Sequence, residues 1–176
     1  MPLATERTIV REMTVADAGF ICTLLNQPSF LRYIGDRNVR SDADAAVFIE
    51  TRYRQSYREH GYGLWVVELR ASGIPIGICG FVRRPTLAAA DLGFAFLPEH
   101  EGHGYAHEAA SASLDYGARV LGFSDVLAIV QPGNVRSSRL LERLHFTCVG
   151  DITLDAASAA LQLWSCRLGD EPVTAN

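Results

Sequence analysis

The feature that most constrains the fold of this chain is its repeated change of hydrophobic period. Short apolar runs typical of strands alternate with stretches whose apolar residues recur every three or four positions, as in helices. The strand-like runs are Thr8–Arg11, Leu64–Leu69, Ile74–Val82, Asp91–Leu97, Asp125–Val130, Thr147–Leu154 and Ala159–Leu168. The helix-like stretches are Ala16–Ile34, Ser41–His60, Gly104–Gly122 and Asn134–Leu144. This order, β-α-α-β-β-β-α-β-α-β-β, predicts one α+β domain with a mixed sheet flanked by helices.

Local signals support several of these boundaries. Ser41 is a good N-cap and Gly61 a good helix stop, so the second helical stretch has both ends marked. The segment Ala71-Ser72-Gly73 predicts a short hairpin loop between two strands. Gly93 lies inside a strand, where glycine marks a bulge or a close backbone approach. The helix after Gly104 has a face of small side chains, which favours close packing on a sheet.

Composition excludes several classes of protein. Hydrophobic residues make up 48% and charged residues 20%, as in ordinary globular domains. The net charge of −4 argues against a duplex-binding protein. No apolar run approaches the roughly 18 residues of a membrane span, and the first residues lack a signal-peptide pattern. The four cysteines stand far apart and predict reduced, buried thiols, so we expect a cytoplasmic protein; the polar tail Gly169–Asn176 looks frayed.

The segment Glu99–Ala106 is the most informative stretch for function. Two glycines, Gly102 and Gly104, stand between an apolar strand and the small-faced helix. Such a turn can aim backbone amides and a helix N-terminus at a phosphate. The alternative is a tight turn without a ligand, and the stretch alone does not separate the two. No Gly-Lys-Ser/Thr follows, and the third glycine of the dinucleotide fingerprint is absent.

The segment Asn134–Phe146 is the second informative stretch. Asn134 follows Gly133 and suits a helix cap. Ser137 lies one turn further on, where its hydroxyl can face a groove above the sheet. Taken alone, either residue is better explained as a cap or a surface residue.

Together the two segments resemble the GNAT superfamily of N-acetyltransferases, with the RimJ/RimL-like subgroup closest. The matching features are Pro98, the Gly-x-Gly-x-Ala turn, the Glu108-Ala109 pair, and Asn-x-x-Ser-x-x-Leu-Leu-Glu-x-Leu-x-Phe after the next strand. The resemblance runs from about Thr8 to Leu168. It implies that residues 1–176 form a single GNAT domain, core about 8–168, whose mixed, mostly antiparallel sheet splits in a V between helices.

The resemblance implies acetyl-CoA as donor, lying in the split of the sheet. The pyrophosphate would be held by the amides of Gly102, His103, Gly104, Tyr105 and Ala106. The backbone of Phe96 and Leu97 would pair with the pantetheine arm like an added strand. An N–H there, after a bulge near Gly93, would also stabilise the oxyanion of the reaction.

In the second segment, the resemblance gives Asn134 a hydrogen bond to the pantetheine. Ser137 matches a serine that protonates the leaving thiolate in this subgroup. Arg139 or Arg143 would contact the adenosine phosphate; as surface arginines they can also be free of any contact.

Three residues depart from the family pattern. Glu101 replaces a glutamine or arginine at the head of the glycine turn, which puts donor affinity in doubt. Leu141 replaces the tyrosine that many relatives use as general acid. His145 replaces a glycine before Phe146, which we interpret as a local variation at a helix end.

The general base stays open at this point. An amine must lose its proton before it attacks, and a lysine needs more help than an α-amine because its pKa is higher. The candidates are Asp91, Glu68, His60 and His100, with Asp91 at the start of the central strand. Each also has a plain structural explanation, since water can relay the proton.

Other chemistries are poorly supported. The residues His100, His103 and His107 suggest metal-ligand spacing, but glycines between them break the helix that would align their rings, so we expect no metal. No Gly-x-Ser-x-Gly marks a serine hydrolase.

The sequence therefore predicts an N-acetyltransferase that joins acetyl-CoA and a primary amine by direct attack in a ternary complex. The acceptor is open among protein N-termini, polyamines, amino acids and antibiotic amines. Its groove would be flanked by the loop Tyr33–Arg40 and by a basic helix face with Arg52, Arg54 and Arg58. The rivals are a catalytically weak acyl-CoA-binding module and a scaffold for another nucleotide. We expect neither nucleic acid nor membrane as partner, and a monomer or homodimer.

Overall fold

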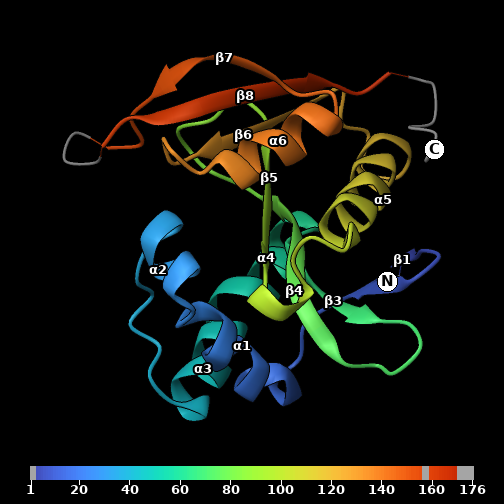
Figure 1. Cartoon of the computed structure of the whole chain (residues 1–176), viewed down its shortest axis with the longest axis vertical. Helices are drawn as coiled ribbons and strands as arrows, with labels where there is room; N and C mark the ends of the chain where they lie inside the picture. The colour runs from blue at the N-terminus through green and yellow to red at the C-terminus, as the bar shows by residue number, and fades with distance from the viewer. Residues whose placement is uncertain (1–2, 156–158, 170–176) are drawn as a thin grey trace.

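The computed structural model describes residues 3–155 and 159–169, and its centre is an eight-stranded sheet (Figure 1). The strand order is β1-β2-β3-β4-β5-β6-β8-β7. Only β5 and β6 pair in parallel, so the sheet is mixed and mostly antiparallel, as predicted. The strands are β1 (Leu3–Ala4), β2 (Thr8–Arg11), β3 (Leu64–Leu69), β4 (Pro75–Val82), β5 (Ala90–Phe96), β6 (Asp125–Val130), β7 (Thr147–Ile152) and β8 (Leu161–Arg167).

Helices cover both faces of the sheet and create two apolar cores. The longer helices are α1 (Ala18–Leu25), α2 (Pro28–Tyr33), α3 (Asp42–Phe48), the π-helical segment η2 (Ile49–Arg54), α4 (Gln55–His60), α5 (Tyr105–Arg119) and α6 (Val135–Arg143). Two short 3-10 turns are η1 (Val15–Asp17) and η3 (Pro98–His100). One core lies under α5 and α6 and contains Trp65; the other lies under α1 and α3 and contains Val66. Neighbouring residues of β3 therefore face opposite cores, as a strand requires.

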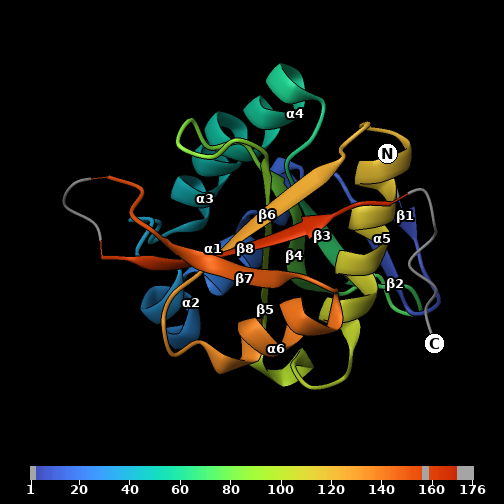
Figure 2. The same ribbon diagram turned by 90° about the horizontal axis from the view of Figure 1, so that it is seen from above.

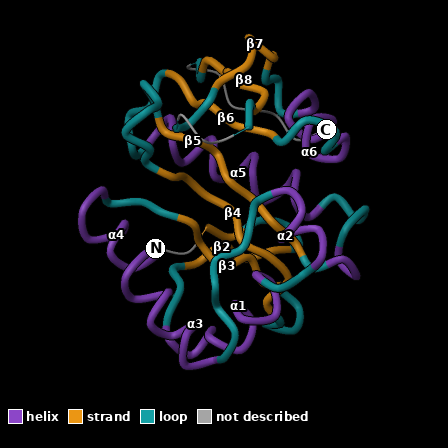
Figure 3. Tube along the Cα trace, turned by 90° about the vertical axis from the view of Figure 1, so that its left-hand side faces the viewer, coloured by secondary structure: helices purple, strands orange, loops and turns teal. Residues whose placement is uncertain are grey.

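The predicted V-shaped split lies between β5 and β6. β5 pairs with β4 over its length from Asp91 to Phe96, but with β6 only at Ala90 and Asp91. Beyond Asp91 the two strands part, and the edge of β5 that faces β6 is left without a strand partner. In Figure 3, β5 runs from the half that holds β6, β7 and β8 to the half that holds β2, β3 and β4.

The small-faced helix packs on the sheet as predicted. Ala109, Ala110 and Ser113 of α5 are fully buried. A Cβ added at Gly117 would lie 2.9 Å from the ring of Phe81 on β4. Only side chains this small allow the helix to approach the sheet so closely.

The two N-terminal helical predictions needed correction inside their limits. The stretch Ala16–Ile34 is interrupted, because Pro28 has no N–H and begins the new helix α2. The stretch from Ser41 to Gly61 has the predicted cap and stop: Ser41 and Asp44 form a capping box, and Gly61 has a φ of 75°. Its interior, however, is the π-helical segment η2. The two-residue strand β1 was missed because it is too short to show a period.

Two further expectations were wrong: that β5 has a bulge near Gly93, and that all four cysteines are buried. Pairing between β4 and β5 shows no shift at Gly93, so there is no bulge there; the irregularity lies on β3, between Val67 and Glu68. Gly93 instead marks a close approach, because a Cβ there would lie 3.1 Å from Leu64 Cδ2. Among the free cysteines, Cys79 and Cys166 are buried, whereas Cys148 is exposed and Cys22 half-buried.

No helix in the described part of the chain is long and apolar enough to cross a membrane. The predicted fraying of the tail concerns residues that lie outside the described ones, apart from Gly169.

Candidate active site

The split of the sheet opens into one groove of about 2010 Å³. Single small-molecule pockets occupy roughly 300–1,000 Å³, so this groove has room for two substrates. Figure 2 shows α6 and the start of α5 on one side, and α4 with the loop after β4 on the opposite side. We call these the α5–α6 side (the groove-lining residues within 101–107 and 133–143) and the α2–α4 side (the groove-lining residues within 29–37, 51–60 and 82–84, which exclude Arg54 and Arg58). Of the α2–α4 side, α4 lies opposite α6 in Figure 2, whereas α2 lies toward α6.

The glycine turn on the α5–α6 side leaves backbone amides available for an anion. Gly102 and Gly104 have φ values of 78° and 84°, a conformation that only glycine adopts at little cost. No side chain caps α5, and its first intrahelical bond runs from Glu108 N to the carbonyl of Gly104. The amides from Tyr105 to His107 therefore lack intrahelical partners and lie at the positive end of the helix dipole.

An anchor from the N-terminal segment holds this turn in place. The Arg7 guanidinium bonds Glu108 Oε2 at 2.7 Å and the His103 carbonyl at 3.0 Å, and it lies 4.9 Å from the Tyr105 ring centre. Burial opposes ionisation of Glu108, but hydrogen bonds from Thr5 and Arg7 outweigh it and hold its pKa below the usual value. In the sequence, Glu108 stood out only as part of a family motif. Nothing in the sequence indicated that Thr5 and Arg7, about a hundred residues away, would bind it.

Glu101 forms an ion pair with Arg136 in the first turn of α6, on the same side of the groove. Because this pair ties the head of the glycine turn to α6, the acidic residue adds no uncompensated charge to the anion site. The doubt that Glu101 raised about donor affinity is thereby reduced.

The open edge of β5 presents backbone groups of alternate residues. The Leu97 amide donates to the Ile76 carbonyl at 2.9 Å, so its N–H faces β4. In an antiparallel strand, neighbouring residues direct their hydrogen-bonding groups to opposite sides. Phe96 and Phe94 therefore direct theirs to the open edge. Phe96 lies where the sequence placed it, and Phe94 takes the place proposed for Leu97.

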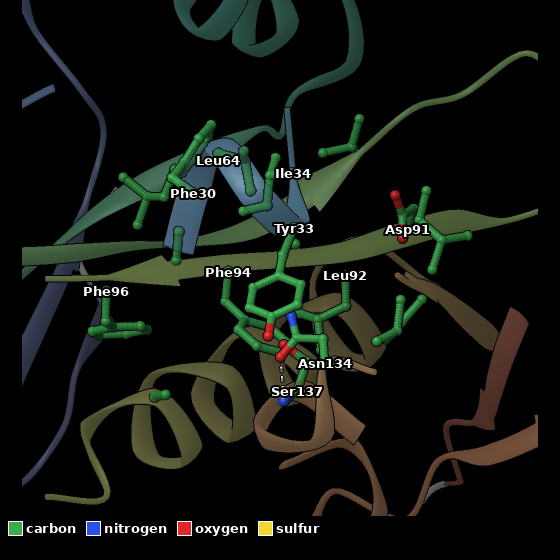
Figure 4. Close-up of a pocket in the computed structure, with 18 of the residues that line it drawn as sticks. Phe30, Tyr33, Ile34, Leu64, Asp91, Leu92, Phe94, Phe96, Asn134 and Ser137 are labelled. Carbon is green, nitrogen blue, oxygen red and sulfur yellow. Dashed lines mark hydrogen bonds between the residues drawn. The ribbon is translucent and has the colours of Figure 1, made fainter. Parts of the chain in front are cut away.

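Asn134 and Ser137 lie together at the start of α6 (Figure 4). Asn134 Oδ1 accepts a hydrogen bond from the Ser137 amide at 3.2 Å, which confirms it as the helix cap. Its Nδ2 stays available as a donor, and both residues line the groove half-buried. Tyr33 of α2 points toward this pair from the other side of the groove. The sequence marked Tyr33 only as the start of a groove wall.

The end of α6 explains two departures from the family pattern. His145 N bonds the Glu142 carbonyl, Phe146 N bonds the Leu141 carbonyl, and His145 has a φ of 63°. This is the Schellman arrangement, in which glycine is usual at the left-handed position. Leu141 is fully buried in the core beside Phe146, so it lends no polar group to the groove.

Arg139 and Arg143 are exposed and line the α5–α6 side. Neither has an ion pair among the described residues. Both are placed where an anionic ligand end can reach them.

Among the candidate bases, Asp91 is the buried carboxylate on the groove. It is 2% exposed and lies where β5 and β6 part. Its Oδ2 accepts a 2.6 Å hydrogen bond from Arg84, whereas Oδ1 has no partner within hydrogen-bonding geometry. Burial raises the pKa of Asp91 to about 6, although the charge and the hydrogen bond of Arg84 lower it.

The other base candidates are less well placed. Glu68 is engaged by Arg11 at 2.7 Å and does not line the groove. His60 lines the groove but is exposed beside Glu59. His100 packs with its ring centre 6.5 Å from that of Tyr105.

The three spaced histidines do not meet. His103 stacks on Tyr105 with ring centres 5.8 Å apart. His107 lies on α5, where burial lowers its pKa. Within residues 3–155 and 159–169, no three metal-ligating side chains form a group that could hold an ion.

The split sheet, the uncapped helix α5 and the open edge of β5 match the arrangement that the resemblance to acetyltransferases led us to expect. The acetyltransferase (GNAT) domain profile matches residues 7–147, so the chain belongs to the GNAT acetyltransferase family, whose members use acetyl-CoA. It is 33% identical over 145 residues to YoaA of Bacillus subtilis, named as an uncharacterized N-acetyltransferase, covering 82% of this chain and 81% of that protein.

Solved structures share the fold at low sequence identity. A ribosomal-protein-S5-alanine acetyltransferase from Vibrio fischeri is 18% identical with a TM-score of 0.79, covering 97% of this chain and 98% of its own. RimL, a ribosomal L7/L12 α-N-protein acetyltransferase solved in complex with coenzyme A, is 13% identical with a TM-score of 0.76; the match covers 96% and 98% of the chains.

Proposed function

We propose that this chain transfers the acetyl group of acetyl-CoA to a primary amine by direct attack in a ternary complex. The observation that carries the proposal is the single groove that runs along the open edge of β5. It has volume for two substrates, and α6 and α4 flank it from opposite directions in Figure 2. Both reactants can therefore be held at one strand, which removes the need for an acetylated enzyme intermediate.

The α5–α6 side suits the donor. The uncapped amides from Gly102 to Ala106 would hold the pyrophosphate, with His103 and Tyr105 contributing through their backbone. The Phe94 and Phe96 backbone would pair with the pantetheine arm, and Asn134 Nδ2 would donate to it. Arg139, which lines the same side, would meet the adenosine phosphate.

The reaction then needs one proton removed and one supplied. Asp91 would take a proton from the incoming ammonium, directly or through water, because its raised pKa leaves it both ionised and basic near neutral pH. The amine nitrogen attacks the acetyl carbon, and the N–H groups of Phe94 and Phe96 face the carbonyl oxygen as charge develops. The carbon–sulfur bond breaks, and Ser137 would give its hydroxyl proton to the thiolate. The second proton of the attacking nitrogen would then pass to the serine oxygen, directly or through water, and restore the hydroxyl.

An α-amine is the acceptor that this site serves best. Its pKa of about 8 lies closer to that of Asp91 than the pKa of about 10.4 of a lysine amine. Structural neighbours include acetyltransferases named for protein α-amines. The whole described chain would act as one catalytic domain with its core at about 8–168.

A second function is favoured by one observation. Leu141 is fully buried and replaces the tyrosine that many relatives use as general acid. Without that acid, the chain would bind acyl-CoA with little turnover. The test is thiol release from acetyl-CoA with a panel of amines, alongside calorimetric binding of the donor. Turnover with an α-amine supports the transferase, whereas donor binding without turnover contradicts it in favour of the binding module.

A further inference from the structure

The α2–α4 side of the groove carries an unbalanced set of cations. Four arginines line it without an acidic partner among the described residues: Arg32, Arg37, Arg52 and Arg83. They come from α2 and the loop after it, from η2, and from the loop after β4. The whole chain has a net charge of −4, so this excess of positive charge is local to the groove.

Three of these guanidinium groups are held by contacts that leave their charge uncompensated. Arg32 lies over the Tyr33 ring, 5.0 Å from its centre. Arg37 donates to the Ile34 carbonyl at 3.4 Å, and Arg83 to the Leu87 carbonyl at 3.0 Å. Each contact restrains the side chain at the wall while its charge stays available to an anion.

The acids on the same side are already engaged. Asp36 forms an ion pair with Arg40, whose hydrogen bonds hold the pKa of Asp36 below its usual value. Glu59 accepts a 2.6 Å hydrogen bond from Gln55 and faces His60. Asp91 is paired with Arg84. Apart from Asp91 Oδ1, the oxygen that faces the reacting amine in the proposed reaction, a cationic group entering here meets arginines without acidic partners and no unpaired carboxylate among the described lining residues.

We propose that the acceptor amine also carries at least one carboxylate, as in an acidic amino acid or a peptide with acidic residues near its N-terminus. This inference rests on the proposed acetyl transfer and specifies its substrate. The arginines attract the carboxylate and orient the amine toward β5, and they repel polycations such as polyamines and aminoglycosides. The donor phosphates do not account for Arg52 and Arg83, because α6, the helix that carries the donor cations Arg139 and Arg143, lies across the groove from α4 and the loop after β4 in Figure 2.

The test is steady-state thiol release with matched acceptors at saturating acetyl-CoA. One arm compares a short peptide of sequence Ala-Asp-Glu with its isosteric Ala-Asn-Gln form. A second arm compares glutamate with its diamide, and a third uses spermidine. We expect the acidic member of at least one pair to have a KM about tenfold lower, with a difference that shrinks as salt rises. The arm that responds identifies the source of the carboxylate.

Two variants localise the effect. Arg52→Gln and Arg37→Gln should each raise the KM of the acidic acceptor about three- to tenfold, leaving the amide acceptor and the donor KM unchanged. The control is Arg58→Gln, the same charge change on a neighbouring exposed arginine that pairs with Glu50 and does not line the groove.

The outcomes separate the two proposals. Equal or better transfer to the amide forms or to spermidine overturns the inference and leaves acetyl transfer standing. A KM rise in Arg58→Gln as large as in Arg52→Gln also overturns it, because the effect would then be general. Donor binding without transfer to any amine overturns acetyl transfer itself, and this inference with it.

Discussion

The two sides of the groove are built in different ways. The α5–α6 side presents backbone: the amides of a glycine turn, the edge of β5 and a helix start capped by Asn134. The α2–α4 side presents long side chains from three segments far apart in sequence. A site made of backbone needs particular residues at fixed spacing, and so it leaves a sequence motif. A site made of side chains on separate segments leaves none.

The largest effect that bears on this comparison concerns Ser137, the one side chain on the α5–α6 side to which we give a chemical step. We expect Ser137→Ala to lower kcat about a hundredfold, because the thiolate loses its proton donor, while donor affinity stays near that of the parent. Stopped-flow thiol release and calorimetry measure the two quantities.

Tyr33→Phe is the matched control for Ser137, because Tyr33 is the second hydroxyl side chain that points toward this position. A loss of kcat in Tyr33→Phe with none in Ser137→Ala would move the proton donor to the α2–α4 side. A loss of donor affinity alone in Ser137→Ala would make the serine a ligand contact.

The next largest effect concerns the glycine turn. Gly104→Val places a β-branched residue at a φ of 84° and a Cβ within 3.2 Å of Arg7 Nη2, so the turn must rearrange. We expect coenzyme A affinity to fall at least about tenfold with the fold retained. The control is Gly73→Val, which has a φ of 69° in the hairpin between β3 and β4 and open space around it. Unchanged affinity in Gly104→Val would reject the backbone site.

This contrast shows how far the sequence could predict the molecule. The element order, the glycine turn and the Asn134 cap were predictable, because each depends on local spacing or local backbone geometry. The pairing of Glu101 with Arg136 and of Glu108 with Arg7 was not, because nothing local links residues so far apart in the chain. The burial of Asp91 likewise depends on where β5 and β6 separate.

A smaller effect concerns Asp91, which lies where β5 and β6 part. Its raised pKa means that the basic, ionised form appears only as the pH rises through about 6. We expect kcat/KM to rise with pH through that value. Asp91→Asn should abolish this rise and lower kcat/KM at pH 7 about tenfold, a modest loss because water can relay the proton. An unchanged ascending limb in Asp91→Asn would assign the base elsewhere.

The smallest effect concerns the stability of the segment after α6 and leaves the residues that line the groove unchanged. His145 occupies a left-handed position that glycine adopts without strain. His145→Gly should therefore raise the free energy of unfolding by about 1 kcal/mol, with donor affinity unchanged. Chemical denaturation measures the first quantity. A loss of stability would mean that the imidazole makes a contact worth more than the strain.

The most direct test of the account is calorimetric titration of the parent protein with acetyl-CoA and with ADP. If the α5–α6 side binds the donor along the glycine turn and the open edge of β5, acetyl-CoA should bind with a micromolar dissociation constant. Its affinity should be much higher than that of ADP, because only acetyl-CoA has a pantetheine arm to pair with the strand. Equal affinity for the two ligands would contradict the account, since the groove would then hold a nucleotide and leave the strand edge unused.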